Sequence, residues 1–437
     1  MDEPFEDPAE AEAWLDAHID YERVAPTRRS IPTLDAMREL ARLLGNPERS
    51  YPVLHLTGTN GKGSTTAMCS ALLAVLGLSV GTYTSPNLHR VHERIAVNGQ
   101  PIPPEALAEL CWLLRALEPS LGERPTRFEL LTMAALRYFS DEAVDVGVIE
   151  VGLGGSWDST NICDAAVAVL TNVEFDHVEI LGPTRADIAR DKAGIIKPGS
   201  IAVIGERDPE LQQLIVREAE ARGAAQVLLA GVDFDLEANT LAVGGRLLSI
   251  RTPYGRYDEV FCSLHGAHQG ANAAVAVVAV EAFLGRALPE AVVDQVLGAA
   301  SVPARCEVVS HRPLVVIDGA HNVAGTQALA ATVTEAFAVE GRRVLVTGML
   351  RGRDPKELLA PLAEAGFTEA VICAPDTPRA MATDEVAAAA AAMGMAVQVI
   401  ADVAEACRSA VKRSKPEDLV VIAGSLYVAG AARAALS

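Results

Sequence analysis

The feature that most constrains the fold is a glycine-rich segment between a short apolar strand and a helix. The strand is Val53 to Leu56, the segment is Gly58-Thr59-Asn60-Gly61-Lys62-Gly63-Ser64, and an Ala- and Leu-rich helical stretch runs from about 64 to 76. A second strand at 79–83 completes a βαβ unit, which requires a parallel sheet covered by helices. The chain is therefore expected to be an α/β protein.

The glycine-rich segment has the chemistry of a phosphate-binding loop. Its glycines let the backbone approach a phosphate closely, the amides at the helix start point outward, Lys62 supplies a cation, and the Ser64 hydroxyl can reach a magnesium ion. Two residues rather than four separate Gly58 from the Gly-Lys pair, so the spacing departs from the common Walker pattern. The predicted nucleotide contacts in this loop are Thr59, Asn60, Gly61, Lys62, Gly63 and Ser64.

The alternation of strands and helices continues and indicates two domains. Further strands are expected at 144–151, 166–171, 314–317, 344–347, 370–373, 396–400 and 419–423, with helices at 272–284 and 290–299. Residues 231–261 form short apolar pieces with turn residues, which predicts a few antiparallel strands appended to the first domain. A hinge is expected at 301–303. The predicted fold class is α/β, with an N-terminal P-loop domain that has a mostly parallel sheet (1–302) and a smaller C-terminal Rossmann-like α/β domain (303–437).

Polar residues follow several of the expected strands. Glu150 ends one strand and His177 follows another, while Asp318 and His321 follow a strand of the second domain. Open parallel sheets bind ligands beyond the carboxyl ends of their strands, so these residues are candidates for a site. Magnesium prefers oxygen ligands, and a lone histidine is more often an ordinary polar residue. From the residues alone, Glu150 is the stronger metal candidate, and Lys192 does not differ from a solvated surface lysine.

Charge and composition exclude several classes of function. The chain has 57 acidic and 37 basic residues, a formal net charge of −20, which disfavours binding to nucleic acid. The N-terminus lacks the basic start and apolar middle of a secretion signal, and the apolar runs are too short or too Ala-rich to span a bilayer. Seven scattered cysteines predict reduced, buried thiols. A cytoplasmic protein without a membrane partner is expected.

Taken together, the motifs resemble those of the folylpolyglutamate synthase and dihydrofolate synthase family, which belongs to the Mur ligase-like enzymes. The resemblance covers nearly the whole chain, in the same order. It rests on residues 58–64, 84–88, 93–95, 150–155, 158–161, 176–177, 181–182, 192–195, 266–269, 272–274, 303–305 and 318–322.

The resemblance implies an ATP-dependent ligase. ATP phosphorylates a carboxylate, and the amine of L-glutamate then attacks the acyl phosphate. The implied magnesium ligands are Ser85, Glu150 and His177, with Ser64 near the metal and the phosphates. Lys192 matches a lysine that is carbamylated by carbon dioxide and assists a second magnesium ion. The implied catalytic residues are Lys62, Lys192 and His321, the further nucleotide contacts are Asn272, Arg305 and Asp318, and the substrate pocket includes Phe128, Glu129, Trp157, Asp158 and Asp20.

Two departures from the family pattern bear on the substrate. Ser156 stands where many members carry arginine, and residues 349–354, including Arg351 and Arg353, replace a more usual acidic and lysine-containing run. The pattern leaves open whether the acceptor is dihydropteroate, a reduced folate, or both.

Two other functions compete with this interpretation. A Mur-type ligase acting on another carboxylate is compatible with the phosphate loop alone. A nucleotide-dependent switch is disfavoured, because the chain has no Asn-Lys-x-Asp motif for guanine and a switch does not need the turn at 318–322. A monomer is expected, since no coiled-coil repeat is visible.

Overall fold

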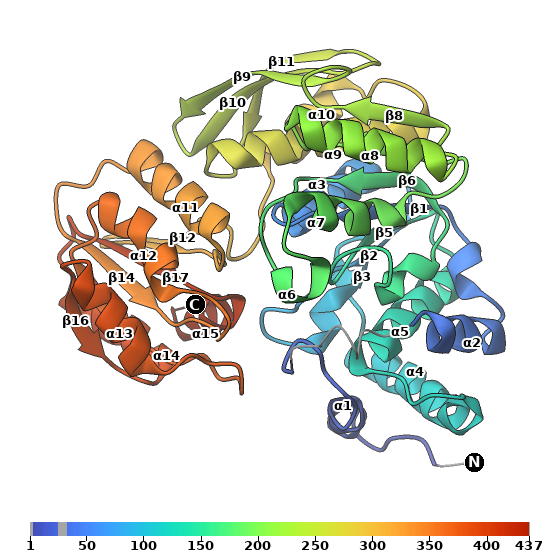
Figure 1. Cartoon of the computed structure of the whole chain (residues 1–437), viewed down its shortest axis with the longest axis horizontal. Helices are drawn as coiled ribbons and strands as arrows, with labels where there is room; N and C mark the ends of the chain where they lie inside the picture. The colour runs from blue at the N-terminus through green and yellow to red at the C-terminus, as the bar shows by residue number, and fades with distance from the viewer. Residues whose placement is uncertain (1–2, 25–32, 437) are drawn as a thin grey trace. The chain divides into compact units, whose positions relative to one another are not determined.

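The computed structural model describes residues 3–24 and 33–436, which fold into two compact units (Figure 1). Unit 1 comprises the chain up to residue 238 together with 248–260 and 271–298. Unit 2 comprises 239–247, 261–270 and the chain from 299 onward.

Unit 1 is built on an eight-stranded sheet in the order β4-β3-β2-β5-β1-β6-β7-β8. From β2 to β8 all neighbouring strands are parallel, and β3 and β4 add an antiparallel edge. The strands are β1 Val53–Thr57, β2 Val80–Tyr83, β3 Ile95–Val97, β4 Gln100–Pro101, β5 Val146–Glu150, β6 Ala165–Leu170, β7 Ile201–Ile204 and β8 Gln226–Leu229.

The central strands are apolar along their whole length because helices cover both sheet faces. Every residue of β1 and β5 is buried, as expected for the middle of a parallel sheet. The helices associated with this sheet are α1 Pro8–Asp16, α2 Asp35–Leu43, α3 Lys62–Val75, α4 Pro104–Leu117, α5 Arg127–Asp141, α6 Val178–Leu181, α7 Arg185–Lys192 and α8 Pro209–Ala221. Gly81 of β2 allows the Phe139 ring of α5 to lie directly on the sheet, since a Cβ at Gly81 would be 2.6 Å from that ring.

Three further strands form a small sheet in the order β11-β10-β9: β9 Asp235–Ala242, β10 Gly245–Arg251 and β11 Arg256–Cys262. The sequence assigned this whole segment to the first domain, but 239–247 belong to unit 2. The buried Arg246 explains the difference. Its guanidinium forms an ion pair with Glu335 at 2.8 Å and donates to the Asn239 carbonyl, also at 2.8 Å, and these interactions hold the segment within unit 2.

The helices α9 Ala267–Leu284 and α10 Glu290–Gly298 follow. α9 begins five residues earlier than the sequence predicted. Its length and composition alone would allow it to cross a membrane. Within the structure 72% of its apolar window is buried, and the core helices of globular proteins have the same character. The burial of α9 therefore explains its composition without a membrane.

Unit 2 contains a six-stranded sheet in the order β12-β13-β17-β14-β15-β16, parallel except for β12 at one edge. The helices α11, α12 and α13 form one row, and α14 and α15 pack against each other (Figure 1). The strands are β12 Glu307–His311, β13 Leu314–Ile317, β14 Arg343–Thr347, β15 Glu369–Ile372, β16 Ala396–Val399 and β17 Leu419–Ala423; the helices are α11 Val323–Ala336, α12 Pro355–Glu364, α13 Thr383–Ala392, α14 Val403–Arg413 and α15 Leu426–Leu436. The predicted α/β fold class is confirmed.

Candidate functional site

Four neighbouring strands of unit 1 lead into the predicted site residues. β2 precedes Ser85, β5 ends at Glu150, β1 precedes the phosphate loop, and β6 precedes His177. These strands are adjacent and parallel in the order β2-β5-β1-β6, so their carboxyl ends lie along one edge of the sheet. The strand order reverses at this point, which is where open α/β sheets bind ligands.

The two residues that follow β6 stabilise the conformation of the phosphate loop. The Thr171 hydroxyl donates to the Asn60 carbonyl at 2.7 Å, and the Asn60 amide donates to the Asn172 side chain at 2.9 Å. α3 begins at Lys62, and its N-terminus has no side-chain cap in the structure. The first amides of a helix need partners from outside it, so this helix start is suited to bind phosphate oxygens.

Gly61 is required by both its conformation and its neighbour. Its φ of +83° lies in the left-handed region that favours glycine, and a Cβ here would be 2.3 Å from the Asn272 side-chain oxygen. Asn272, a predicted nucleotide contact, is buried and lies directly against the loop. The structure therefore brings Asn272 and the loop together, although more than 200 residues separate them in sequence.

Two lysines share one acceptor in this loop. The Lys62 Nζ donates to the Gly58 carbonyl at 2.9 Å, and the Lys192 Nζ donates to the same oxygen at 2.8 Å. Lys192 is only 3% exposed. Burial, with the nearby Lys62 charge, lowers the pKa of Lys192 to about 7, and the carboxylate of Asp191 partly opposes this. Lys192 is thus not the solvated lysine that the residues alone indicated.

Ser85 and Glu150 are the part of the predicted metal site with the clearest geometry. The Ser85 hydroxyl is buried and has no hydrogen-bond partner in the described structure, and the Ser85 amide lies 3.4 Å from a Glu150 carboxylate oxygen. That carboxylate is buried and lies 3.7 Å from the Cβ position of Gly63 in the phosphate loop. A hydroxyl and a carboxylate are hard oxygen ligands, so this pair fits magnesium.

The geometry supports His177 as a metal ligand less than it supports Ser85 and Glu150. It adopts a left-handed φ of +50°, its Nε2 lies 3.7 Å from an Asp176 oxygen, and its side chain is 30% exposed. Within residues 3–24 and 33–436, no three His, Cys, Asp or Glu side chains are grouped closely enough to hold a metal. A magnesium ion bound by Glu150 therefore needs other oxygens, such as the Ser85 hydroxyl, phosphate or water.

The predicted substrate-pocket residues differ in what they contact. The Phe128 ring lies against Gly152, whose Cβ would be 2.6 Å from it, just beyond Glu150. Glu129 caps α5, because its carboxylate accepts from the Thr126 amide at 2.7 Å. Asp158 accepts from the Leu153 amide at 2.9 Å and so shapes the glycine turn after β5.

Trp157 and Asp20 make local contacts as well. Trp157 is half-buried against the core formed by β6, β7, α7 and α8. The Asp20 carboxylate accepts from the Glu22 amide at 2.9 Å. Their assignment to a substrate pocket remains a prediction.

Sequence reasoning missed the pairing of Arg94 with Glu22. The guanidinium of Arg94 is 2% exposed, donates to both Glu22 oxygens at 2.7 and 2.6 Å, and also reaches the Asn87 side chain at 2.7 Å. A buried, two-pronged Arg–carboxylate contact orients its partners strongly. It holds the N-terminal segment next to the loop that follows Ser85. Since 72 residues separate the pair, no local pattern could reveal it.

In unit 2 the predicted residues gather at the carboxyl end of β13. The Asp318 carboxylate accepts from the Cys306 and Ala320 amides, both at 2.7 Å. Burial raises the pKa of Asp318, and the nearby Arg305 charge partly offsets this. The His321 Nδ1 lies 2.8 Å from the Gly319 carbonyl, to which it must donate. A neutral His321 therefore carries its proton on Nδ1 and its lone pair on Nε2.

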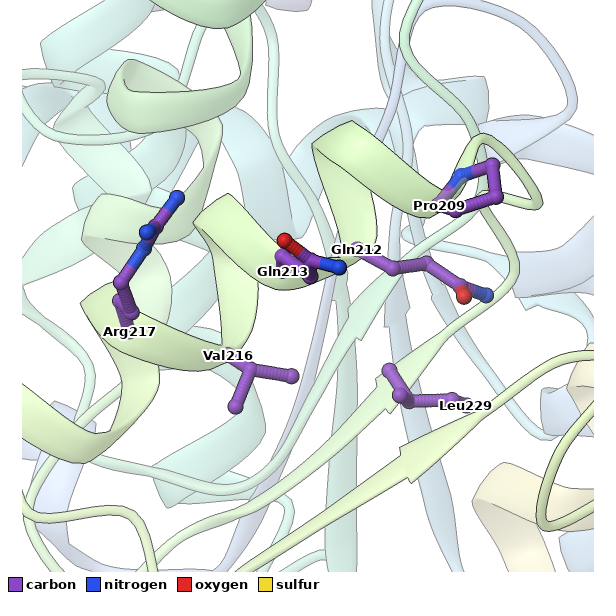
Figure 2. A pocket seen from close by; sticks show the side chains of 6 residues that line it. All are labelled: Pro209, Gln212, Gln213, Val216, Arg217 and Leu229. Carbon is purple, nitrogen blue, oxygen red and sulfur yellow. The ribbon is translucent and has the colours of Figure 1, made fainter.

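The surface of unit 1 also has a pocket of 370 Å³ away from these residues. Figure 2 shows that side chains of α8 and β8 line it. The lining residues are Pro209, Gln212, Gln213, Val216, Arg217 and Leu229. None of the predicted site residues contributes to it.

Comparison with known proteins places this geometry in a family. Residues 56–280 match the Mur ligase middle domain, and residues 304–426 match the Mur ligase glutamate ligase domain. The dihydrofolate synthase/folylpolyglutamate synthase of Mycobacterium tuberculosis is 36% identical over 93% of this chain and 91% of the relative. The folylpolyglutamate synthase of Lacticaseibacillus casei is 35% identical over 91% and 92%. This chain belongs to the dihydrofolate synthase/folylpolyglutamate synthase family.

Solved structures of the family agree with this assignment. M. tuberculosis folylpolyglutamate synthase, complexed with ADP and AMPPCP, superposes with a TM-score of 0.89 at 34% identity, with 98% of both chains covered. E. coli FolC in complex with DHPP and ADP gives a TM-score of 0.84 at 30% identity, with 96% of both covered. The predictions of the family and of an ATP-dependent ligase are confirmed.

The contact between Gly61 and Asn272 predicts a large effect of one methyl group. Gly61→Ala should weaken ATP binding by at least about tenfold, because the left-handed backbone and the Asn272 side chain both oppose a Cβ. Gly77→Ala is the matched control. Gly77 follows the other end of α3 with a φ of +90°, but its Cβ would meet nothing within 4 Å. Calorimetric titration with a nonhydrolysable ATP analogue, with thermal melting of both variants, measures the difference. Equal affinity of the two variants would contradict the assignment.

Proposed function

We propose that this protein joins L-glutamate by an amide bond to dihydropteroate, to the γ-carboxyl of the glutamyl tail of a reduced folate, or to both, while ATP is converted to ADP and phosphate. The observation that carries the proposal is the similarity to folylpolyglutamate and dihydrofolate synthases along nearly the whole chain. The complex of a 30% identical relative with DHPP and ADP supports the acceptor and the nucleotide.

The reaction has two steps. A carboxylate oxygen of the acceptor attacks the γ-phosphorus of ATP, and ADP leaves to give an acyl phosphate. The amine of L-glutamate then attacks the acyl carbon, loses a proton, and expels phosphate. The first step requires neutralisation of negative charge on the transferred group, which the loop amides and Lys62 provide. Asn272, Arg305 and Asp318 are assigned to nucleotide binding.

Magnesium is assigned to Ser85, Glu150 and His177, with Ser64 close to it. When bound, the metal neutralises charge on the phosphate oxygens. The buried hydroxyl of Ser85, which has no partner in the described structure, supports this assignment, as does the neighbouring Glu150 carboxylate. The chain's own contribution is to fix the positions of these oxygens at the ends of two adjacent strands.

Lys192 is assigned as a carbamylated lysine that assists a second magnesium ion. Carbamylation joins the unprotonated amine to carbon dioxide, forms an N–C bond and releases one proton. A pKa of about 7 supports this chemistry, because much of the amine is then unprotonated at neutral pH. The product is an anion next to Lys62, so a repulsion between the buried Lys192 and the partly buried Lys62 becomes an attraction.

His321 is assigned to the second step, near the reacting phosphate and the incoming glutamate. Its Nδ1 proton is held by the Gly319 carbonyl at 2.8 Å, so the lone pair of a neutral His321 ring is on Nε2. In this tautomer Nε2 can act as the base that accepts the proton lost by the glutamate amine.

The remaining assignments concern the whole protein. Residues 1–302 serve as the ATP-binding domain and 303–437 as the glutamate ligase domain, with Phe128, Glu129, Trp157, Asp158 and Asp20 contributing to the folate pocket. We place the protein in the cytoplasm as a monomer without a nucleic-acid or membrane partner. All seven cysteines are buried and unpaired, which supports a reducing compartment.

The test is an activity measurement with two acceptors. Purified protein receives ATP, magnesium and L-glutamate with either dihydropteroate or a reduced monoglutamyl folate, and both ADP release and product mass are followed. A gain of one glutamyl unit is expected on at least one acceptor, which also shows whether the protein has one activity or two. ADP release without a new amide on either acceptor would overturn the proposal.

The assignment of Lys192 predicts dependence on carbon dioxide. Lys192→Ala should lower kcat by about 100-fold, and a short carboxylic acid such as acetate should partly restore it by replacing the carbamate. Wild-type activity should fall in carbonate-free buffer and recover with bicarbonate, more slowly below the pKa of about 7, where the amine is protonated. Lys197→Ala, five residues away, is the control and should change kcat little. Loss of activity without rescue by either bicarbonate or acetate would contradict carbamylation.

A further inference from the structure

Arg305 lies in a strained backbone segment. The residues on either side of it, Ala304 and Cys306, both adopt left-handed conformations, with φ of +55° and +48°. Residues with a Cβ rarely adopt this conformation, and it persists only where surrounding contacts impose it. Ala304 is fully buried and Cys306 is 2% exposed, so both are enclosed by surrounding contacts.

Two carboxylates impose this conformation. Asp318 accepts from the Cys306 amide at 2.7 Å, and Glu307 accepts from the Ala304 amide at 2.9 Å. The carbonyl of Ala304 is also engaged, because it accepts from the Gly319 amide at 2.8 Å and from the Arg305 guanidinium at 3.1 Å. The segment is therefore fixed on both sides of Arg305.

Glu307 also connects this segment to the last helix of the chain. Its second carboxylate oxygen accepts from the Arg433 guanidinium of α15 at 3.0 Å. Glu307 is the first residue of β12, and its side chain is 23% exposed, so the ion pair is only partly screened by water. One carboxylate thus joins the backbone before Arg305 to the C-terminal helix.

Arg305 itself fits tightly in this position. A Cβ on Gly319 would lie 2.4 Å from an Arg305 guanidinium nitrogen, so the side chain crosses the turn after β13 at close range. A small rotation of the 304–306 backbone would move the guanidinium away from this turn. The orientation of Arg305 therefore depends on the hydrogen bonds that hold the amides on either side of it.

We infer that Glu307, held by Arg433, is a positioning residue that orients Arg305 for the nucleotide. This inference rests on the proposed function only in assigning Arg305 to nucleotide binding. Glu307 contacts neither Arg305 nor the predicted catalytic side chains in any described interaction, and it acts through the Ala304 amide.

The test compares nucleotide binding in four variants. Glu307→Ala should weaken ADP binding, measured by calorimetry, and raise the KM for ATP by about tenfold, the effect of losing one charge-assisted hydrogen bond, while kcat changes less. Glu307→Gln should fall between Glu307→Ala and wild type, because its amide oxygen can still accept from Ala304 but its NH2 group cannot accept from Arg433. Arg433→Ala, which removes the same ion pair, should have a similar intermediate effect. Glu369→Ala, which removes the ion pair with Arg342 in the same unit at 2.9 Å, is the control and should not change ADP affinity.

A double variant separates positioning from general stability. If Glu307 acts through Arg305, Glu307→Ala should add no further loss of ADP affinity to Arg305→Ala. Full additivity of the two losses would overturn the inference, as would a lowered melting temperature of Glu307→Ala with unchanged ADP affinity. Calorimetry with ADP does not require turnover, so the inference can fail or hold independently of whether the wild-type protein forms an amide.

Discussion

The carbonyl of Gly58 organises the candidate site of unit 1. It accepts from two lysines, Lys62 and Lys192, which come from helices far apart in sequence. Two ammonium groups near one oxygen repel each other, and burial adds the cost of removing Lys192 from water. The nearby Asp191 carboxylate and the lowered pKa of Lys192, about 7, offset only part of this repulsion. A bound polyphosphate, or a carbamate on Lys192, relieves it.

The surrounding strands and helices place further polar side chains around the phosphate loop. Ser85 and Glu150 follow adjacent parallel strands, and Asn272 presses on Gly61 from another helix. In unit 2 the same principle applies at β13, where Asp318 fixes the backbone around Arg305 and Gly319 fixes the tautomer of His321. Each unit therefore presents its polar groups at the carboxyl ends of its strands, where parallel sheets leave room for a ligand.

Much of the fold could be predicted because buried parallel strands are short apolar runs flanked by glycine and polar residues. β13 and β17 have the predicted bounds, and β1, β5 and β6 agree within one or two residues at each end. The strands β3, β4, β7, β8 and β12 were missed. β3, β4 and β12 are antiparallel edges and β8 is a partly exposed strand at the other edge of its sheet, so they lack the continuous buried apolar pattern. β7 is apolar and mostly buried, but it has only four residues.

The candidate site could be predicted only where its chemistry is local. The phosphate loop and the turn after β13 are recognisable because strand, turn and helix follow one another in the sequence. Lys192, Arg94 and Glu307 derive their character from contacts with residues 134, 72 and 126 positions away, respectively. Such contacts are set by tertiary packing, which no local spacing records. The resemblance to a family could mark Lys192, but the burial that lowers its pKa is visible only in the structure.

Transfer of an oxygen isotope tests most directly whether an acyl phosphate links ATP to amide formation. The acceptor is prepared with ¹⁸O in the reacting carboxylate and turned over with ATP and L-glutamate, and the released phosphate is analysed by mass spectrometry. One ¹⁸O is expected in each phosphate formed, since the carboxylate oxygen leaves with the phosphoryl group. Phosphate without the label, formed together with ADP, would show that water attacks ATP and would contradict an acyl phosphate intermediate.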